Sequence, residues 1–443
     1  MLRNIGSNIV GTILPALAAL AAVPLLLSHL GLERFGIFSM QVAALFFFGL
    51  SDFGISRAIV LLSFEPGSAG APAWVRPYRI GLRYSAMLAA AVAAGGLVVA
   101  AGLRIWHPAT ADPADLALSS AIMFASAAVM LVSQPPRAVL EARQQFLLAN
   151  LIRGPAAAAI FLAPLMAFAI GSTSLTSAAI AIFLTRALAA VCYFRCCRTA
   201  GTVPIPEVEA RALRQAFLRK AGWLGMTNVL SMLIGYADRF ILAPLTSAAA
   251  VGQYVIAQEV VTKLWIASGA VISAGTPRLA SHRSDAAPLR RTGRQLVLAM
   301  WGMGVLPAAV LILFGEPLLK LWLRASFDPA SVVPLQVMAL GIGVNNLSQI
   351  NFALLQVHGG EHRGAFLQLF HLGFLGAALA LLVPRFGIDG AAIAFTVRLL
   401  IDSLLVRHLL CGTSREAGHA GVGLGMLVAC AALLGALLAS RWF

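Results

Sequence analysis

The stretch GYADRFILAPL, residues 235–245, lies inside an apolar segment that runs over 221–246. An apolar helix of about 20 residues crosses the roughly 30 Å hydrocarbon layer of a membrane. Such segments recur along the 443 residues, of which 60% are hydrophobic and only 11% are charged. Because about a quarter of the residues in a soluble domain are charged, the sequence predicts an integral membrane protein.

Twelve spans joined by short connections account for most of the apolar segments, and a further apolar run follows near the C-terminus. The spans are 8–28, 36–62, 80–103, 115–134, 148–170, 174–194, 221–246, 251–276, 294–318, 332–356, 364–384 and 388–410. We therefore expect an all-α membrane protein with an N-terminal six-helix lobe over 1–194, a cytoplasmic amphipathic linker over 195–220, a C-terminal six-helix lobe over 221–410 and an extra transmembrane helix over 421–440.

The two halves share a weak pattern in their first spans. Asn8 and Pro24 are 16 positions apart in one half, and Asn228 and Pro244 have the same separation in the other. An even number of spans in each half means that both halves enter the membrane from the same side. The pattern therefore predicts parallel repeats related by an axis along the membrane normal, with a cavity between them.

The net charge of +15 follows the predicted topology. With the N-terminus placed in the cytoplasm, most of the 32 Lys and Arg residues fall in connections on the cytoplasmic side. Membrane proteins commonly show this excess of basic residues in their cytoplasmic loops. The charge therefore predicts a cytoplasmic N-terminus and does not require nucleic acid as a partner.

The sequence carries no motif for catalysis or metal binding. It has no H-E-x-x-H zinc motif, no phosphate-binding Gly loop with Lys and no G-x-S-x-G elbow. The five cysteines lack a paired C-x-x-C spacing, which predicts reduced thiols without a metal or a disulfide. We therefore expect a protein that is not an enzyme, without cofactor or metal. Its transport would run on an ion gradient or on the gradient of the substrate.

Four stretches carry a resemblance to a known family: PLLLSHLGLERFGIFSM (24–40), LSDFGISRAI (50–59), YADRFILAPLTSAAAVGQYVIAQEV (236–260) and GTPRLAS (275–281). On these motifs the chain resembles the polysaccharide transport, or O-antigen flippase, family of the multidrug/oligosaccharidyl-lipid/polysaccharide superfamily. The resemblance implies two six-helix lobes in a V around a central cavity. It also implies that an undecaprenyl-diphosphate-linked oligosaccharide moves from the cytoplasmic to the outer leaflet by alternating access.

The same resemblance implies a multi-pass protein of the bacterial inner membrane. Its expected partners are the undecaprenyl-diphosphate-linked glycan and the lipid bilayer, with a polysaccharide polymerase or glycosyltransferases as further candidates. Two other functions stay open. A multidrug–cation antiporter of the same superfamily would need an acid-rich cavity. A membrane-embedded polysaccharide polymerase or ligase would need a sizeable outer loop, whereas the predicted outer connections are short.

Basic side chains within the spans are candidates for substrate binding. A charge inside a span costs about 2.5–3.5 kcal/mol on insertion scales and usually faces protein or a water-filled cavity. Cations near mid-membrane would compensate the charge of a diphosphate, and the amides of NNLSQIN, residues 345–351, would bind sugars. The candidates are Arg186, Lys263, Arg398, Arg239, Arg57, Asn345 and Asn346.

Ion pairing within one helix is the alternative for some of these residues. Glu259 and Lys263 are four positions apart, as are Arg398 and Asp402, so each pair shares a helix face. Arg186 has no obvious acidic partner on its own helix, which makes it the better candidate for binding an anion.

Acidic residues within the spans are candidates for coupling transport to an ion, and they are Asp52, Asp238, Glu259 and Asp402. Asp238 and Arg239 are adjacent, so their side chains point about 100° apart around a helix. We expect Arg239 to face the substrate path and Asp238 to be either a packing anchor or an ion site. For Arg57, near the cytoplasmic end of its span, the alternative is a side chain that reaches the membrane interface.

Overall fold

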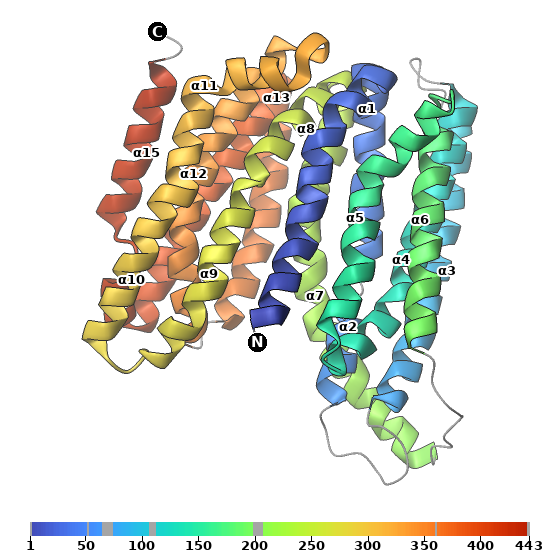
Figure 1. Ribbon diagram of the computed structural model, residues 1–443. Helices are drawn as coiled ribbons and strands as arrows, with labels where there is room; N and C mark the ends of the chain where they lie inside the picture. The colour runs from blue at the N-terminus through green and yellow to red at the C-terminus, as the bar shows by residue number, and fades with distance from the viewer. Residues whose placement is uncertain are drawn as a thin grey trace. The chain divides into compact units, whose positions relative to one another are not determined.

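The computed structural model describes residues 2–50, 53–63, 74–105, 112–197, 207–358 and 361–440. All regular secondary structure in these ranges is helical (Figure 1). The chain forms two compact units, Met1–Tyr236 and Ala237–Phe443. The boundary falls within the long helix α7 (Glu207–Leu245), so this helix contributes residues to both units.

Helix α4 is the centre of the first unit. It packs against α1, α2, α3 and α6, while α1 and α5 pack against each other. The buried face of α4 contains many small residues, such as Ala117, Ser126 and Ala127, which allow neighbouring helices to approach closely. The helices of this unit are α1 (Leu2–Leu50), α2 (Ile55–Leu62), α3 (Val75–Ile105), α4 (Pro113–Ala142), α5 (Phe146–Ala169), α6 (Leu175–Cys196) and most of α7.

Helix α12 is the centre of the second unit. It packs against α8, α9, α11, α13 and α15, and Figure 1 shows α11, α12 and α15 running alongside one another. The elements that follow α7 are α8 (Ala248–Thr262), α9 (Leu264–Ser281), α10 (Ala286–Met300), the π-helix η1 (Trp301–Val305), α11 (Leu306–Leu323), the 3₁₀ turns η2 (Arg324–Ser326) and η3 (Pro329–Ser331), α12 (Val332–Val357), α13 (Glu361–Thr413), α14 (Arg415–Ala420) and α15 (Leu424–Ala439).

Two long helices, α1 and α13, each combine two spans that the sequence predicts separately, and each bends at a glycine with positive φ. Gly31 (φ 74°) lies within α1, and Gly387 (φ 55°) lies within α13. Glycine adopts a positive φ at little cost because it has no Cβ. The first and second predicted spans therefore follow each other across a single bend, and so do the eleventh and twelfth.

Three predicted spans are less regular than the sequence indicates. The second, 36–62, is divided between α1, which ends at Leu50, and α2, which begins at Ile55. The eighth is divided at Lys263, between α8 and α9. The ninth contains the π-helix η1 between α10 and α11. Gly304 of this π-helix lies against Asn346 of α12, and a Cβ at position 304 would collide with that side chain. A π-helix of one turn is rare and occurs frequently at functional sites.

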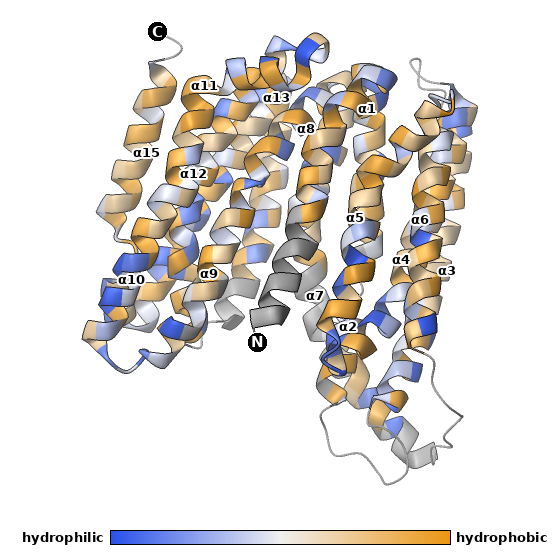
Figure 2. Cartoon of the chain, viewed as in Figure 1, coloured by the Kyte–Doolittle hydropathy of each residue, from blue (hydrophilic) through white to orange (hydrophobic). Residues whose placement is uncertain are grey.

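Ten helices in the described ranges are long and apolar enough to cross a membrane. Large apolar side chains such as Leu97, Leu188 and Leu321 are exposed on them, and Figure 2 shows apolar residues along much of their length. An exposed apolar surface of this kind is unfavourable in water and favourable in lipid. The protein is therefore an all-α integral membrane protein, as predicted, and the additional C-terminal run forms α15.

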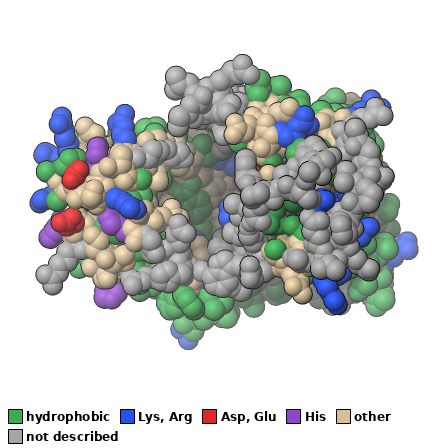
Figure 3. Space-filling view, turned by 90° about the horizontal axis from the view of Figure 1, so that it is seen from below, with side chains coloured by type: hydrophobic (Ala, Val, Ile, Leu, Met, Phe, Trp, Pro, Cys, Tyr) green, Lys and Arg blue, Asp and Glu red, His purple; other side chains and the backbone are tan. Residues whose placement is uncertain are grey.

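Basic side chains gather on one face of α10. Arg290, Arg291 and Arg294 are exposed, while Leu289 and Leu296 on the opposite face are buried. Figure 3 shows Lys and Arg side chains on the end of the second unit seen from below, where Figure 1 draws α10. This separation suits a helix whose charged face meets water and lipid headgroups at the membrane surface.

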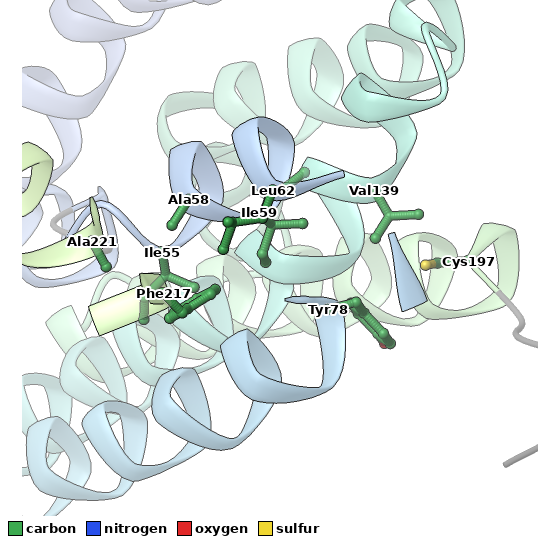
Figure 4. Close-up of a cluster of buried hydrophobic side chains, with 10 residues drawn as sticks. Ile55, Ala58, Ile59, Leu62, Tyr78, Val139, Cys197, Phe217 and Ala221 are labelled. Atoms are coloured by element: carbon green, nitrogen blue, oxygen red, sulfur yellow. The ribbon is translucent and has the colours of Figure 1, made fainter. Parts of the chain in front are cut away.

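A cluster of buried apolar side chains joins α2 to its neighbours in the first unit (Figure 4). Ile59 of α2 lies among Tyr78 of α3, Val139 of α4 and Phe217 of α7, and Cys197 follows the end of α6 in the same cluster. Phe217 has no exposed surface. Burial raises the pKa of the Cys197 thiol to about 11, because the charged thiolate is poorly solvated there.

The connection between α13 and α15 is held by Asn351 of α12. Its Nδ2 donates to the Val422 carbonyl at 3.1 Å, and its Oδ1 accepts from the Val422 N–H at 2.7 Å. Asn351 is fully buried. A buried backbone amide and carbonyl need hydrogen-bond partners, so this single side chain stabilises the position at which the chain enters α15.

Replacing Asn351 with Ala leaves the N–H and the C=O of Val422 without these partners. Each unsatisfied group lowers the free energy of unfolding by about 1–3 kcal/mol. We expect Asn351→Ala to lower the midpoint of thermal unfolding of the detergent-solubilised protein by several degrees. Gln356→Ala changes an exposed residue of the same helix and serves as the control. Equal midpoints for the two variants would contradict the role of Asn351.

In a variant that keeps Cys197 as its only cysteine, alkylation at pH 8 should be slow. A pKa of about 11 leaves about one thiol in a thousand as the reactive thiolate. Phe217→Ala removes an aromatic ring from the cluster and should raise the alkylation rate, measured by mass spectrometry. Leu218→Ala alters an exposed neighbour on α7 and should not change it. An equal acceleration in both variants would show that the cluster does not protect the thiol.

Candidate functional site

Asp238 of α7 is 2% exposed and accepts three hydrogen bonds. Its Oδ2 accepts from the Tyr254 hydroxyl at 2.8 Å and from Gln258 Nε2 at 2.6 Å, and both donors belong to α8. Its Oδ1 accepts from the backbone N–H of Arg239 at 2.8 Å. The carboxylate therefore links α7 to α8 with most of its hydrogen-bonding capacity satisfied.

The guanidinium of Arg239 binds the other end of the same glutamine. Gln258 Oε1 accepts from Arg239 Nε at 3.2 Å and from Nη2 at 3.0 Å. Arg239 Nη2 also lies 3.7 Å from Glu259 Oε1, and Glu259 Oε2 pairs with Lys263 Nζ at 2.6 Å. Because Gln258 donates to Asp238 and accepts from Arg239, it connects two charges that point in different directions from adjacent positions.

A second set of hydrogen bonds surrounds Asp402 of α13. His371 Nε2 lies 2.8 Å from Asp402 Oδ1, and Asn345 Nδ2 donates to Asp402 Oδ2 at 2.9 Å. The Oδ1 of Asn345 accepts from Trp265 Nε1 and from Gln349 Nε2, both at 3.2 Å. This set therefore joins α9, α12 and both segments of α13.

Arg398 of α13 interacts with a carboxylate from each of the two sets. It is buried, its guanidinium is 5.3 Å from the centre of the Phe395 ring, and it interacts electrostatically with Asp402 and Asp238. Its Nε has no hydrogen-bond partner among the residues that the structure describes. A buried donor of this kind is expected to bind water or an anion.

Six side chains of the second unit form one charged cluster in which opposite charges balance. The acidic members are Asp238, Glu259 and Asp402, and the basic members are Arg239, Lys263 and Arg398. With His371 neutral, the cluster has no net charge. Protonation of His371 beside Asp402 would give this region one positive charge.

Arg186 is the one buried charged side chain in the described part of the first unit. It belongs to α6, which packs against α4 and α5. Only 7% of its surface is exposed, and neither Nε nor Nη2 finds a hydrogen-bond acceptor in the described ranges. A buried guanidinium costs free energy unless it is paired or hydrogen-bonded, so these N–H groups are suited to an anionic ligand or to water.

Asn346 of α12 is fully buried, and its two amide heteroatoms have no partner within the described ranges. Its side chain lies against Gly304 of the π-helix. Asn345, its neighbour, is bound to Asp402 and Trp265. The two asparagines that the sequence assigned to sugar binding therefore face different surroundings.

The structure distributes the predicted site residues in three groups. Arg239, Lys263, Arg398, Asp238, Glu259 and Asp402 lie in the charged cluster, with Asn345 bound to one of its members. Arg186 lies in the other unit. Arg57 is exposed, in accord with the alternative of a side chain at the interface. Asp52 lies outside the described residues. The roles of these residues in binding and coupling stay predictions.

One predicted ion pair is confirmed, because Glu259 pairs with Lys263 as the spacing of four indicates. Asp402 interacts electrostatically with Arg398, while its hydrogen bonds go to His371, on the other segment of α13, and to Asn345. The sequence did not single out His371 and Gln258 as site residues. The partners of both lie on another helical segment, 31 positions away for His371 and at least 19 for Gln258. The only signal for His371 was a histidine inside a long apolar segment.

A buried charged cluster inside a bundle of apolar helices is typical of a membrane transporter, because polar groups within spans usually mark a path for a substrate or an ion. The model of the polysaccharide biosynthesis protein family matches residues 1–283. The chain belongs to this family. It is also 23% identical over 411 residues to the "Putative O-antigen transporter" of Shigella flexneri, covering 92% of this chain and 97% of that protein.

Solved transporter structures share the fold. Lipid II flippase MurJ in an inward closed conformation aligns with a TM-score of 0.72 and 11% identity, over 100% of this chain and 92% of that one. An inward-facing multidrug resistance transporter of the MATE family aligns with a TM-score of 0.64 and 14% identity, over 97% and 94%. At these identities the likeness concerns the fold. The predicted resemblance is confirmed.

Removing the cation of Arg239 should destabilise the second unit, because its Nη2 lies 3.7 Å from Glu259 Oε1. Breaking a buried ion pair from one side costs about 3–5 kcal/mol, because the remaining charge loses part of its compensation. We expect Arg239→Met to lower the midpoint of thermal unfolding of the purified protein. Adding Glu259→Gln removes the carboxylate that faced Arg239 and should recover part of the loss. A double variant that is no more stable than Arg239→Met would contradict the coupling of these two residues.

Proposed function

We propose that this protein is a flippase that moves a lipid-linked polysaccharide precursor across the bacterial inner membrane. The observation that carries the proposal is its likeness to the Shigella flexneri protein, which extends over nearly the whole of both chains. Membership of the polysaccharide biosynthesis family and the fold shared with a lipid II flippase support the same kind of cargo.

The cargo in this proposal is an undecaprenyl-diphosphate-linked oligosaccharide, which moves from the cytoplasmic to the outer leaflet by alternating access. A diphosphate is a strong acceptor of hydrogen bonds from guanidinium groups. Arg186 and Arg398 are buried and keep N–H groups that no described residue accepts. Each of these arginines can donate to a diphosphate from within its own unit, whereas Lys263 and Arg239 already bind carboxylates.

The charge of the first unit favours an anionic cargo over a cationic drug. An antiporter for cations would need an acidic group to compensate the positive charge of its cargo inside the membrane. In the described part of this unit, the buried charged side chain is Arg186, and no carboxylate is buried beside it. The charged cluster of the second unit contains acidic residues, but each of them is matched by a basic one.

The proposal places the N-terminus in the cytoplasm and assigns no catalysis to the chain. The excess of Lys and Arg in the predicted cytoplasmic connections supports this orientation. A transporter of this kind forms and breaks no covalent bond, so its residues need only bind the headgroup and release it on the other side of the membrane.

Replacing Arg186 with Ala removes a buried charge without leaving a carboxylate unpaired. If Arg186 binds the diphosphate, loss of a charge-assisted hydrogen bond worth about 1.5–3 kcal/mol should slow transport by about tenfold or more. Arg186→Lys should retain part of the activity. The measurement is surface polysaccharide in cells that lack their own flippase, supported by flipping of the lipid-linked glycan in proteoliposomes.

Arg195→Ala is the matched control, because Arg195 is exposed on the same helix. It should transport at the rate of the unmodified protein. Normal transport by a folded Arg186→Ala variant would remove Arg186 from the binding site. Absence of flipping by the unmodified protein in proteoliposomes, with the lipid-linked glycan supplied, would contradict the proposed function itself.

A further inference from the structure

His371 and Asp402 lie at the same level of the second unit although 31 positions separate them. Both belong to α13, which bends back at Gly387. His371 precedes the bend by 16 residues and Asp402 follows it by 15, so each lies about 23 Å along its segment at 1.5 Å per residue. The equal depth brings His371 Nε2 within 2.8 Å of Asp402 Oδ1.

The two members of this pair differ in exposure. The side chain of His371 is 3% exposed and that of Asp402 is 23% exposed. The carboxylate is therefore the member through which a proton can enter. His371 Nδ1 has no hydrogen-bond partner in the part of the chain that the structure describes. With Nε2 directed at the carboxylate, Nδ1 is the atom with a free position for an added proton.

The surrounding charges are compensated without His371. The other members of the charged cluster come from three helices. Helix α7 contributes Asp238 and Arg239, and α13 contributes Arg398. Glu259 belongs to α8, and Lys263 directly follows that helix. Tyr254 of α8 is bound to Asp238, while α9 and α12 contribute the uncharged Trp265, Asn345 and Gln349. Histidine is the side chain that ordinarily changes charge between pH 5 and 8. Uptake of one proton by the pair would therefore change the net charge of the cluster from zero to +1.

Protonation of the pair would be transmitted to two further helices. Asp402 accepts from Asn345 of α12, which in turn accepts from Trp265 of α9. A change in charge on Asp402 or His371 alters the strength of each bond in this series, because hydrogen-bonded chains polarise one another. The pair thus connects proton binding to the contact of α13 with α12 and α9.

We propose that His371 and Asp402 together bind the proton whose gradient drives transport. The inference rests on the proposed flippase function and extends it by naming the coupling ion and its site. The proton is shared by the pair as a unit. Its binding adds one positive charge, and its release on the other side of the membrane restores the neutral cluster. His371 acts here as a proton-binding residue.

The test measures flipping in proteoliposomes, with and without an imposed pH gradient, for the unmodified protein and two variants. His371→Gln keeps an N–H in place of Nε2 but does not titrate. A gradient of one pH unit is worth about 1.4 kcal/mol for one proton, so it should change the rate of the unmodified protein by up to about tenfold. His371→Gln should flip at a rate that the gradient does not change.

His408→Gln is the matched control, because His408 is exposed on the same helix. It should keep the full response to the gradient. A gradient response that survives in His371→Gln would overturn the inference, and so would flipping by the unmodified protein that no pH gradient alters. In both cases the flippase function stands. Asp402→Asn provides a second variant, which should also lose the response, should His371→Gln fail to fold.

A second measurement tests the proton site without transport. The fluorescence of Trp265, obtained as the difference between the unmodified protein and Trp265→Phe, should show a pH-dependent transition. The transition should be lost in His371→Gln and kept in His408→Gln. If the unmodified protein does not flip the glycan, the flippase function fails, and the proton site is then supported or overturned by this transition alone.

Discussion

The structure depends on the requirement that polar groups inside a membrane find their partners within the protein. Water is scarce there, and an unpaired charge or amide costs several kcal/mol. In the second unit this requirement is met by Gln258, which binds Asp238 with one end and Arg239 with the other. The same requirement explains why Asn351 binds both the N–H and the C=O of Val422. Stability and the position of the charges therefore have one physical origin.

The few groups that do not meet the requirement are the most informative. Arg186 and Arg398 are buried with N–H groups that no described residue accepts. Maintaining such groups costs stability, which a ligand would restore by pairing with them. Since both are cationic and permanently charged, the ligand chemistry they suit is anionic. The diphosphate of the proposed lipid-linked cargo has this chemistry.

The charged cluster of the second unit has a different character. Its carboxylates and cations compensate each other, so it offers little net attraction for a charged cargo. A compensated cluster is nevertheless sensitive to the addition of one proton, because that proton changes its net charge from zero to +1. His371 is the group that can receive it, through its contact with Asp402. In the proposed mechanism, different residues bind the cargo and couple its transport to an ion.

The sequence alone establishes the membrane class, the number and length of the apolar segments and the residues whose charges are unusual. These follow from composition and local spacing, which hydrocarbon thickness and helix geometry constrain directly. Spacing also predicts the pair of Glu259 with Lys263, because both lie on one helix face. The partnership of Asp402 with His371 was decided by tertiary structure, since it depends on the bend at Gly387 that returns one segment of α13 against the other. Contacts between distant segments follow from packing, and a single sequence does not encode them as a local pattern.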